Sequence, residues 1–152
     1  MKKIIVSLAL LLPILVACHR TELPLLNRAD FQTEVDGKPV DLYLLKSGDL
    51  TLQVTNFGGR IVSLYAPDRD GKYEDVVLGH KNIDQYINAE GERFLGSVVG
   101  RYGNRIAKGQ FTLDGTTYQL PINNNGQTLH GGLKRLDLVV WDVVNVTDQS
   151  IE

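Results

Sequence analysis

Residues 110–119 read QFTLDGTTYQ and predict an antiparallel β-hairpin. The dipeptide Asp114-Gly115 suits a two-residue turn, because both of its positions tolerate a positive φ angle. Such a turn fixes the register of the facing pairs: Leu113–Thr116, Thr112–Thr117, Phe111–Tyr118 and Gln110–Gln119. One side of the ribbon is then apolar and aromatic, and the other side is polar. We therefore expect one buried and one exposed face.

Similar short strands separated by turn dipeptides recur after residue 30, with no helical stripe longer than two turns. The runs predicted as strands are 40–46, 50–57, 61–65, 75–78, 111–120 and 138–146. The turn dipeptides are Asp36-Gly37, Ser47-Gly48, Asp70-Gly71 and Asp114-Gly115. This pattern predicts an all-β, antiparallel domain over residues 31–152. Residues 82–90 fit either a short helix or an irregular loop.

The run 138–146, LVVWDVVNV, resembles a long central strand that is buried on both faces in its first half. A strand this apolar needs neighbours on each side and a second sheet facing it. Because the sequence stops at Glu152, before such elements follow, we expect residues 31–152 to be the N-terminal part of a larger domain.

The composition excludes several classes of function. Sixteen Lys and Arg against eighteen Asp and Glu give a formal net charge of −2, unlike the strongly basic profile of a nucleic-acid-binding protein. Cys18 is the single cysteine, so an internal disulfide is excluded. With only three histidines besides, a cysteine-based zinc site is excluded as well.

The N-terminus resembles a secretory signal. Lys2 and Lys3 precede an uncharged run from residue 4 to residue 17, which is too short to span a bilayer comfortably. The run ends Leu-Val-Ala-Cys at Cys18 and resembles the lipobox of bacterial lipoproteins, in which the cysteine is lipidated and becomes the first mature residue. The alternative is an ordinary cleaved signal with an incidental cysteine.

We therefore expect a lipoprotein signal peptide over residues 1–17 and a tether over residues 18–30. The lipid on Cys18 would anchor the exported chain to a bacterial membrane, on the periplasmic side or at the cell surface. His19 stands where an Asp would retain the lipoprotein at the inner membrane in enterobacteria-like sorting, which favours the outer membrane.

Two polar, glycine-rich segments interrupt the strand pattern. The first, residues 100–109, reads GRYGNRIAKG. Arg101 and Arg105 carry fork-shaped donors that suit paired oxygens such as neighbouring sugar hydroxyls, and Asn104 offers a donor and an acceptor. The alternative is a basic loop whose arginines pair with surface carboxylates.

The second segment, residues 123–132, reads NNNGQTLHGG. Its asparagines and glycine suit turn conformations, and the two glycines after His130 allow a ligand to approach the imidazole closely. A neutral imidazole can hydrogen-bond a hydroxyl or ring oxygen, or act as an acid or base near pH 7. The alternative is a loop histidine that caps a strand end.

Both segments resemble the aldose 1-epimerase (galactose mutarotase) family. The resemblance rests on residues 100–111, GRYGNRIAKGQF, on Leu129-His130-Gly131-Gly132, and on 55–61 and 76–79. It extends over about residues 31–144. It implies an antiparallel β-supersandwich and the interconversion of the α and β anomers of free hexoses such as galactose and glucose, with no metal and no cofactor.

By this resemblance, Asn104, Arg105 and His130 bind the sugar hydroxyls. The family's catalytic pair, a second His and a Glu, has no counterpart within the 152 residues, so we assign no catalytic residue in this chain and expect an inactive fragment. Two alternatives remain open: a non-catalytic carbohydrate-binding lipoprotein module and a degenerate remnant without activity.

Overall fold

The computed structural model describes residues 22–152. The expected signal peptide, Cys18 and the first residues of the expected tether lie outside the described residues. Within residues 22–30, the carbonyl of Pro24 accepts a hydrogen bond of 2.8 Å from the Tyr65 hydroxyl, and the backbone of Leu26 makes two hydrogen bonds with the side chain of Gln53. This segment therefore lies against the sheet. No helix among the described residues is long and apolar enough to cross a membrane.

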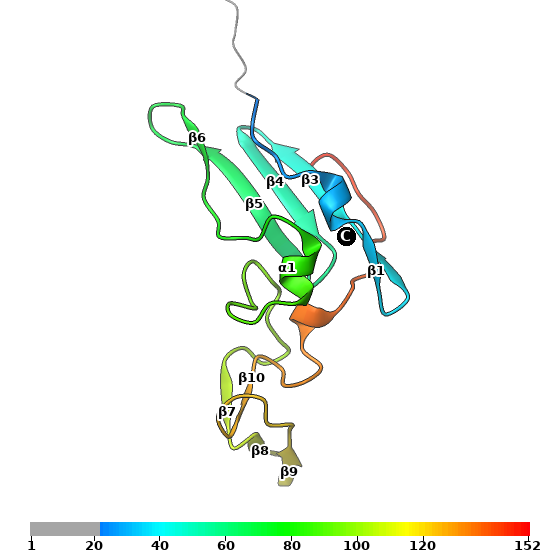
Figure 1. Ribbon diagram of the computed structural model, residues 1–152. Coiled ribbons are helices and arrows are strands. Elements are labelled where there is room, and N and C mark those ends of the chain that lie inside the picture. Colours follow the sequence, from blue (N-terminus) through cyan, green and yellow to red (C-terminus); the bar gives the residue numbers. More distant parts are fainter. Residues whose placement is uncertain (1–21) are drawn as a thin grey trace, which may run out of the picture.

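The main sheet is a four-stranded antiparallel meander in the order β3-β4-β5-β6 (Figure 1). Its strands are β3 (Leu42–Ser47), β4 (Leu50–Thr55), β5 (Arg60–Pro67) and β6 (Tyr73–Asp75). Before it come the 3-10 helix η1 (Arg28–Phe31) and the hairpin of β1 (Thr33–Val35) and β2 (Lys38–Val40). The all-β antiparallel prediction is confirmed.

The core lies between one face of this sheet and the helices. Residue range 82–90, which fitted a helix or a loop, forms the helix α1 (Ile83–Ile87), capped by the Asn82 side chain. Eight buried side chains form the main cluster: Phe31, Val40, Leu42, Phe57, Val62, Ile83, Tyr86 and Val140. They come from η1, β2, β3, β5 and α1, from the bend after β4 and from the segment after η2, so their burial holds these parts together.

A second, smaller part lies beyond α1 (Figure 1). It contains β7 (Arg105–Ala107) paired with β10 (Gln127–Leu129), and the hairpin of β8 (Gln110–Leu113) and β9 (Thr116–Gln119). The predicted register of the hairpin is confirmed at all four pairs. Asp114 and Gly115 both have positive φ, at 48° and 75°. The two-residue turn at Asp114-Gly115 therefore sets the pairing of β8 with β9.

Our expectation that one face of this hairpin is buried is wrong. All residues of β8 and β9 are exposed, including Phe111 at 38% and Tyr118 at 45%. Their rings stack on each other, with centroids 5.1 Å apart and planes 15° apart. The two rings cover one another because no layer of the described chain packs against them.

The long strand expected over residues 138–146 is also wrong. The segment begins with the 3-10 helix η2 (Leu136–Leu138) and makes only isolated bridges, from Val140 to Phe57 and from Val146 to Ile151. Its amide and carbonyl groups bond to the bend after β4: Trp141 donates to the Asn56 carbonyl, and Gly58 donates to the Val139 carbonyl. It therefore closes the end of the sheet without extending it, and Val144 is 83% exposed.

Two other strand boundaries differ from the expectation. The run 40–46 is divided at Asp41, whose amide donates to the Asn56 side chain rather than to a neighbouring strand. Of the run 75–78 only Asp75 lies in a strand, because β6 ends there and the carboxylate of Asp75 accepts hydrogen bonds from the amides of Leu64 and Val77. In both places an aspartate or asparagine side chain takes backbone bonds that a ladder would have used.

Candidate functional site

The two glycine-rich segments meet through the pairing of β7 with β10, in which Arg105 faces Leu129. Asn104 and His130 follow directly beyond that pair. The His130 amide donates to the Asn104 carbonyl at 3.0 Å, and the Asn104 amide donates to Nδ1 of His130 at 3.0 Å. Both residues have positive φ, at 66° and 50°, a region that asparagine and histidine enter more readily than most residues. The structure therefore brings these two predicted site residues together.

The hydrogen bond from the Asn104 amide determines which nitrogen of the His130 ring carries the proton. Because Nδ1 accepts a hydrogen bond, the neutral imidazole carries its proton on Nε2. The ring also contacts Phe94 edge to face, with centroids 4.6 Å apart. His130 therefore offers one N–H donor, at Nε2, in an orientation set by Asn104 and Phe94.

Arg105 is held by amide oxygens. Its Nε donates to Oδ1 of Asn124 at 3.1 Å, and one terminal nitrogen donates to Oδ1 of Asn104 at 3.3 Å. Among residues 22–152 Arg105 forms no ion pair with a carboxylate. The alternative of a basic loop paired with surface carboxylates therefore does not describe Arg105, whose remaining N–H groups stay available to a ligand.

A cavity of about 770 Å³ lies beside these residues. Its lining is Arg101, Tyr102, Asn104, Arg105, Ile106, Ala107, Phe111, Leu120, Thr128, Gly131, Lys134 and Leu136. Asn104 and Arg105 thus face the cavity, whereas His130 adjoins it through Asn104 and Gly131. The described lining carries cationic groups and no carboxylate, so it offers hydrogen-bond donors to a ligand rich in oxygen atoms.

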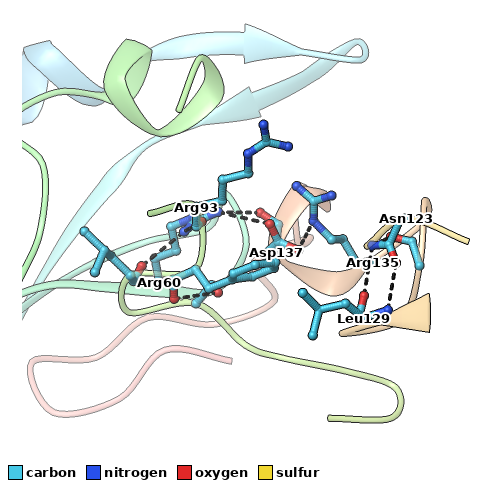
Figure 2. Close-up of polar contacts among 10 residues, drawn as sticks. Arg60, Arg93, Asn123, Leu129, Arg135 and Asp137 are labelled. Atoms are coloured by element: carbon cyan, nitrogen blue, oxygen red, sulfur yellow. Dashed lines mark hydrogen bonds and ion pairs between the residues drawn. The ribbon is translucent and has the colours of Figure 1, made fainter. Parts of the chain in front are cut away.

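The side chain of Asn123 holds the segment that carries His130. Its Nδ2 donates to the carbonyls of Leu129 and Gly132 at 3.0 Å each, and its Oδ1 accepts from the Leu129 amide at 2.7 Å (Figure 2). The asparagines of this segment therefore have different roles. Asn125 adopts the left-handed conformation of a turn, with φ 44°. The Asn123 side chain instead supplies the hydrogen-bond partners that the backbone groups of Leu129 and Gly132 would otherwise lack.

Sequence reasoning missed the cluster that joins this part to the sheet. Arg60 is fully buried, and its guanidinium donates to the carbonyls of Arg93, Leu95 and Asp137 (Figure 2). Burial lowers the pKa of Arg60, and the nearby Asp137 carboxylate opposes that shift. Arginines are mostly exposed in proteins, so no local pattern marks this one. In the described part of the chain, no three His, Cys, Asp or Glu side chains gather to hold a metal ion.

Comparisons with known proteins identify the family of this chain. The model of the family described as aldose 1-epimerase matches residues 41–152. Galactose mutarotase from Rattus norvegicus is 43% identical over 105 residues, which are 69% of this chain and 30% of the rat protein. A probable aldose 1-epimerase from Arthroderma benhamiae is 40% identical over 117 residues, 74% of this chain and 27% of that protein. The chain thus spans about 30% of the length of these relatives.

Solved structures match as well. An aldose epimerase homologue from C. elegans superposes with a TM-score of 0.67 at 32% identity, over 74% of this chain and 34% of that one. A galactose 1-epimerase from Lactobacillus acidophilus gives a TM-score of 0.62 at 28% identity, over 77% and 33% of the two chains. The mostly β, antiparallel architecture is therefore that of a part of the galactose mutarotase-like structures. With the family model covering residues 41–152, the chain belongs to the aldose 1-epimerase family.

Proposed function

We propose that this chain supplies the sugar-binding loops of an aldose 1-epimerase that acts on free hexoses such as galactose and glucose. The observation that supports the proposal most is that Asn104 and Arg105 of one glycine-rich segment meet His130 of the other, through the hydrogen bond between Asn104 and His130, with Arg105 bonded to Asn104. Neighbouring hydroxyls of a pyranose present paired oxygens. The guanidinium of Arg105 and the Nε2–H of His130 can donate to such oxygens.

Anomer interconversion needs a base that removes the proton of the anomeric hydroxyl and an acid that protonates the ring oxygen. The bond between C1 and O5 then breaks, the aldehyde end rotates, and the ring closes on the other face. In this proposal Asn104, Arg105 and His130 bind and orient the pyranose. No residue of this chain is assigned the acid or the base.

Calorimetric titration of the full chain with D-galactose tests the binding site. The variants His130→Ala and Arg105→Gln should each weaken the galactose affinity about tenfold, the cost of losing one hydrogen bond to the ligand. Arg69→Gln is the matched control, because the Arg69 side chain is 92% exposed in the turn between β5 and β6. Equal affinity in all four proteins would contradict the proposed site.

A non-catalytic carbohydrate-binding role is the second candidate. The absence of a carboxylate from the described cavity lining favours it, since an acid–base pair commonly includes one. Polarimetry of freshly dissolved α-D-galactose tests this second candidate. Because no residue of this chain is assigned the acid or the base, galactose binding with no faster change of optical rotation agrees with both candidates, whereas acceleration above the uncatalysed rate would contradict the binding module.

We also propose that lipid on Cys18 anchors the protein to a bacterial membrane, with the outer membrane favoured by His19. The sequence before Cys18 supports this, since a charged start, an apolar run and a cysteine at its end are the parts of a lipoprotein signal. Labelling of expressing bacteria with a palmitate analogue should mark the wild-type chain and not a Cys18→Ala variant. Equal labelling of both chains would contradict the anchor.

A further inference from the structure

We propose that Arg135 is a positioning residue that fixes the orientation of the His130 imidazole through the ring of Phe94. The inference rests on the proposed sugar-binding function of His130. Arg135 does not line the cavity and lies in the segment just before η2. Its influence on His130 therefore has to pass through the groups that separate them.

The first step is the contact between Arg135, Phe94 and His130. The guanidinium carbon of Arg135 lies 5.3 Å from the centre of the Phe94 ring, at a cation–π distance. The same ring meets His130 edge to face at 4.6 Å. Phe94 is thus in contact with the Arg135 cation and the His130 imidazole, and the position of Arg135 limits where both rings can lie.

The second step is the ion pair that holds Arg135. Its Nε lies 2.7 Å from Oδ1 of Asp137, and its side chain is only 12% exposed. The Nε–H is not aligned on that oxygen as a hydrogen bond, so the attraction is mainly electrostatic. Asp137 is 1% exposed, and a buried carboxylate pairs strongly with a cation because water does not screen it.

The third step is Arg60, which ties both segments to the sheet. One terminal nitrogen donates to the carbonyls of Arg93 and Leu95, on either side of Phe94, at 2.9 and 3.1 Å. The other donates to the Asp137 carbonyl at 2.9 Å and lies 3.6 Å from its carboxylate. A single buried guanidinium from β5 therefore fixes the backbone beside Phe94 and the backbone beside Arg135 (Figure 2).

These steps link the fully buried Arg60 to His130 through Phe94. The Nδ1 bond from Asn104 selects the tautomer of His130 but leaves the ring free to tilt about that bond. Phe94 restricts the tilt, and the Arg60–Asp137–Arg135 cluster keeps Phe94 in place. The Nε2–H donor of His130 is thereby held in one direction before a sugar arrives, which reduces the ordering cost of binding.

Nuclear magnetic resonance of the full chain tests this inference, with the His130 signals assigned by their loss in His130→Gln. In Arg135→Gln we expect the ring-current shift that Phe94 exerts on the His130 protons to decrease. We also expect D-galactose affinity to fall about two- to fivefold, in line with the loss of one cation–π contact. Arg93→Gln is the matched control, because Arg93 contributes only its carbonyl and its guanidinium points away (Figure 2).

Two further variants separate positioning from folding. Arg135→Lys retains the charge facing Asp137 but not the planar group over Phe94, so the melting temperature should be kept and the His130 shift lost. Phe94→Leu leaves the ion cluster intact and removes the ring, so it gives the His130 signals expected without any ring-current shift from Phe94. If Arg135→Gln fails to fold, Arg135→Lys decides the question, because it changes Arg135 and leaves the Phe94 ring in place.

A folded Arg135→Gln or Arg135→Lys protein with wild-type His130 signals would overturn the inference. Wild-type galactose affinity in Arg135→Gln would overturn it as well. Failure of the wild-type chain to bind galactose is a different result. It would reject the proposed function, whereas the His130 signals would still show whether Arg135 and Phe94 fix the ring.

Discussion

Gly131 lies so close to Gly100 that a Cβ atom on Gly131 would stand 2.1 Å from the Gly100 carbonyl oxygen. The two glycine-rich segments therefore touch through their backbones, one residue beyond His130 and next to Arg101. Such an approach is open only to a residue without a side chain. The φ of Gly131, +94°, adds a second reason, because residues with a Cβ rarely adopt it.

Gly131→Ala should separate the two segments. We expect a loss of about 2–4 kcal/mol in the free energy of unfolding, from the clash and the positive φ together, and galactose binding weakened at least tenfold (on the order of 1.4 kcal/mol). Urea denaturation and calorimetry measure the two effects. Gly103→Ala is the control, since a Cβ there meets nothing within 4 Å. Gly131→Ala behaving like Gly103→Ala would refute the close approach.

Asn123→Asp should loosen the segment that carries His130. The variant keeps the acceptor for the Leu129 amide but replaces the donor to the Leu129 and Gly132 carbonyls with a negatively charged oxygen. We expect about 2–3 kcal/mol lower stability and faster hydrogen exchange at the Leu129 and Gly132 amides. Unchanged exchange at both amides would show that the side chain does not hold the segment.

Asp137→Asn should destabilise the whole chain. It leaves Arg60 and Arg135 buried without their carboxylate, a change that costs about 3–5 kcal/mol for buried pairs. The matched control is Lys72→Gln at the exposed Lys72–Glu74 pair, which should leave the urea midpoint unchanged. A similar midpoint for the two variants would mean that the buried pair adds no stability.

Asp41 should make the chain sensitive to acid. The hydrogen bond from Arg28 holds the pKa of Asp41 below its ordinary value, with the Leu42 amide adding to the shift and partial burial opposing it. Because the folded state lowers this pKa, the pair contributes stability above the ordinary aspartate value of about 4. That contribution is lost as the pH falls through the lowered pKa.

Asp41→Asn should therefore be less stable than the wild type at neutral pH and should lose less stability on acidification. Urea midpoints measured from pH 7 to pH 2 (about the range that spans aspartate titration) test this expectation. Arg28→Gln should give a similarly flattened profile, and Arg69→Gln should keep the wild-type profile. Parallel acid profiles in Asp41→Asn and the wild type would contradict the linkage.

Local signals in the sequence predicted much of this fold. Asp114-Gly115 set the hairpin register because a two-residue turn admits one pairing, and the alternation around it matched that pairing. The glycines around Asn104 and His130 likewise marked segments that leave the strand pattern. In these places residues close together in the sequence determine the backbone conformation, so the local sequence is enough to predict it.

Other features depended on distant partners that no local pattern reveals. The run 138–146 is as apolar as a central strand, but the backbone of its first half bonds to the bend at 56–58 and that of Val144 and Asn145 bonds to Glu152. Hydrophobic periodicity does not identify such partners. The burial of Arg60 depends on carbonyls contributed by residues 93, 95 and 137. The role of Asn104, Arg105 and His130 as sugar ligands stays a prediction, although their proximity is now established.

The left-handed backbone of Asn104 and His130 restricts how this site can change. Most replacements at these two positions would strain the main chain, whatever their effect on a ligand. Asn104→Gly removes the side chain without such strain, because glycine adopts positive φ readily. Arg101 and Lys134 face the same cavity without a positive φ. Laboratory selection for a different sugar should therefore accumulate substitutions at Arg101 and Lys134 while it leaves Asn104 and His130 untouched.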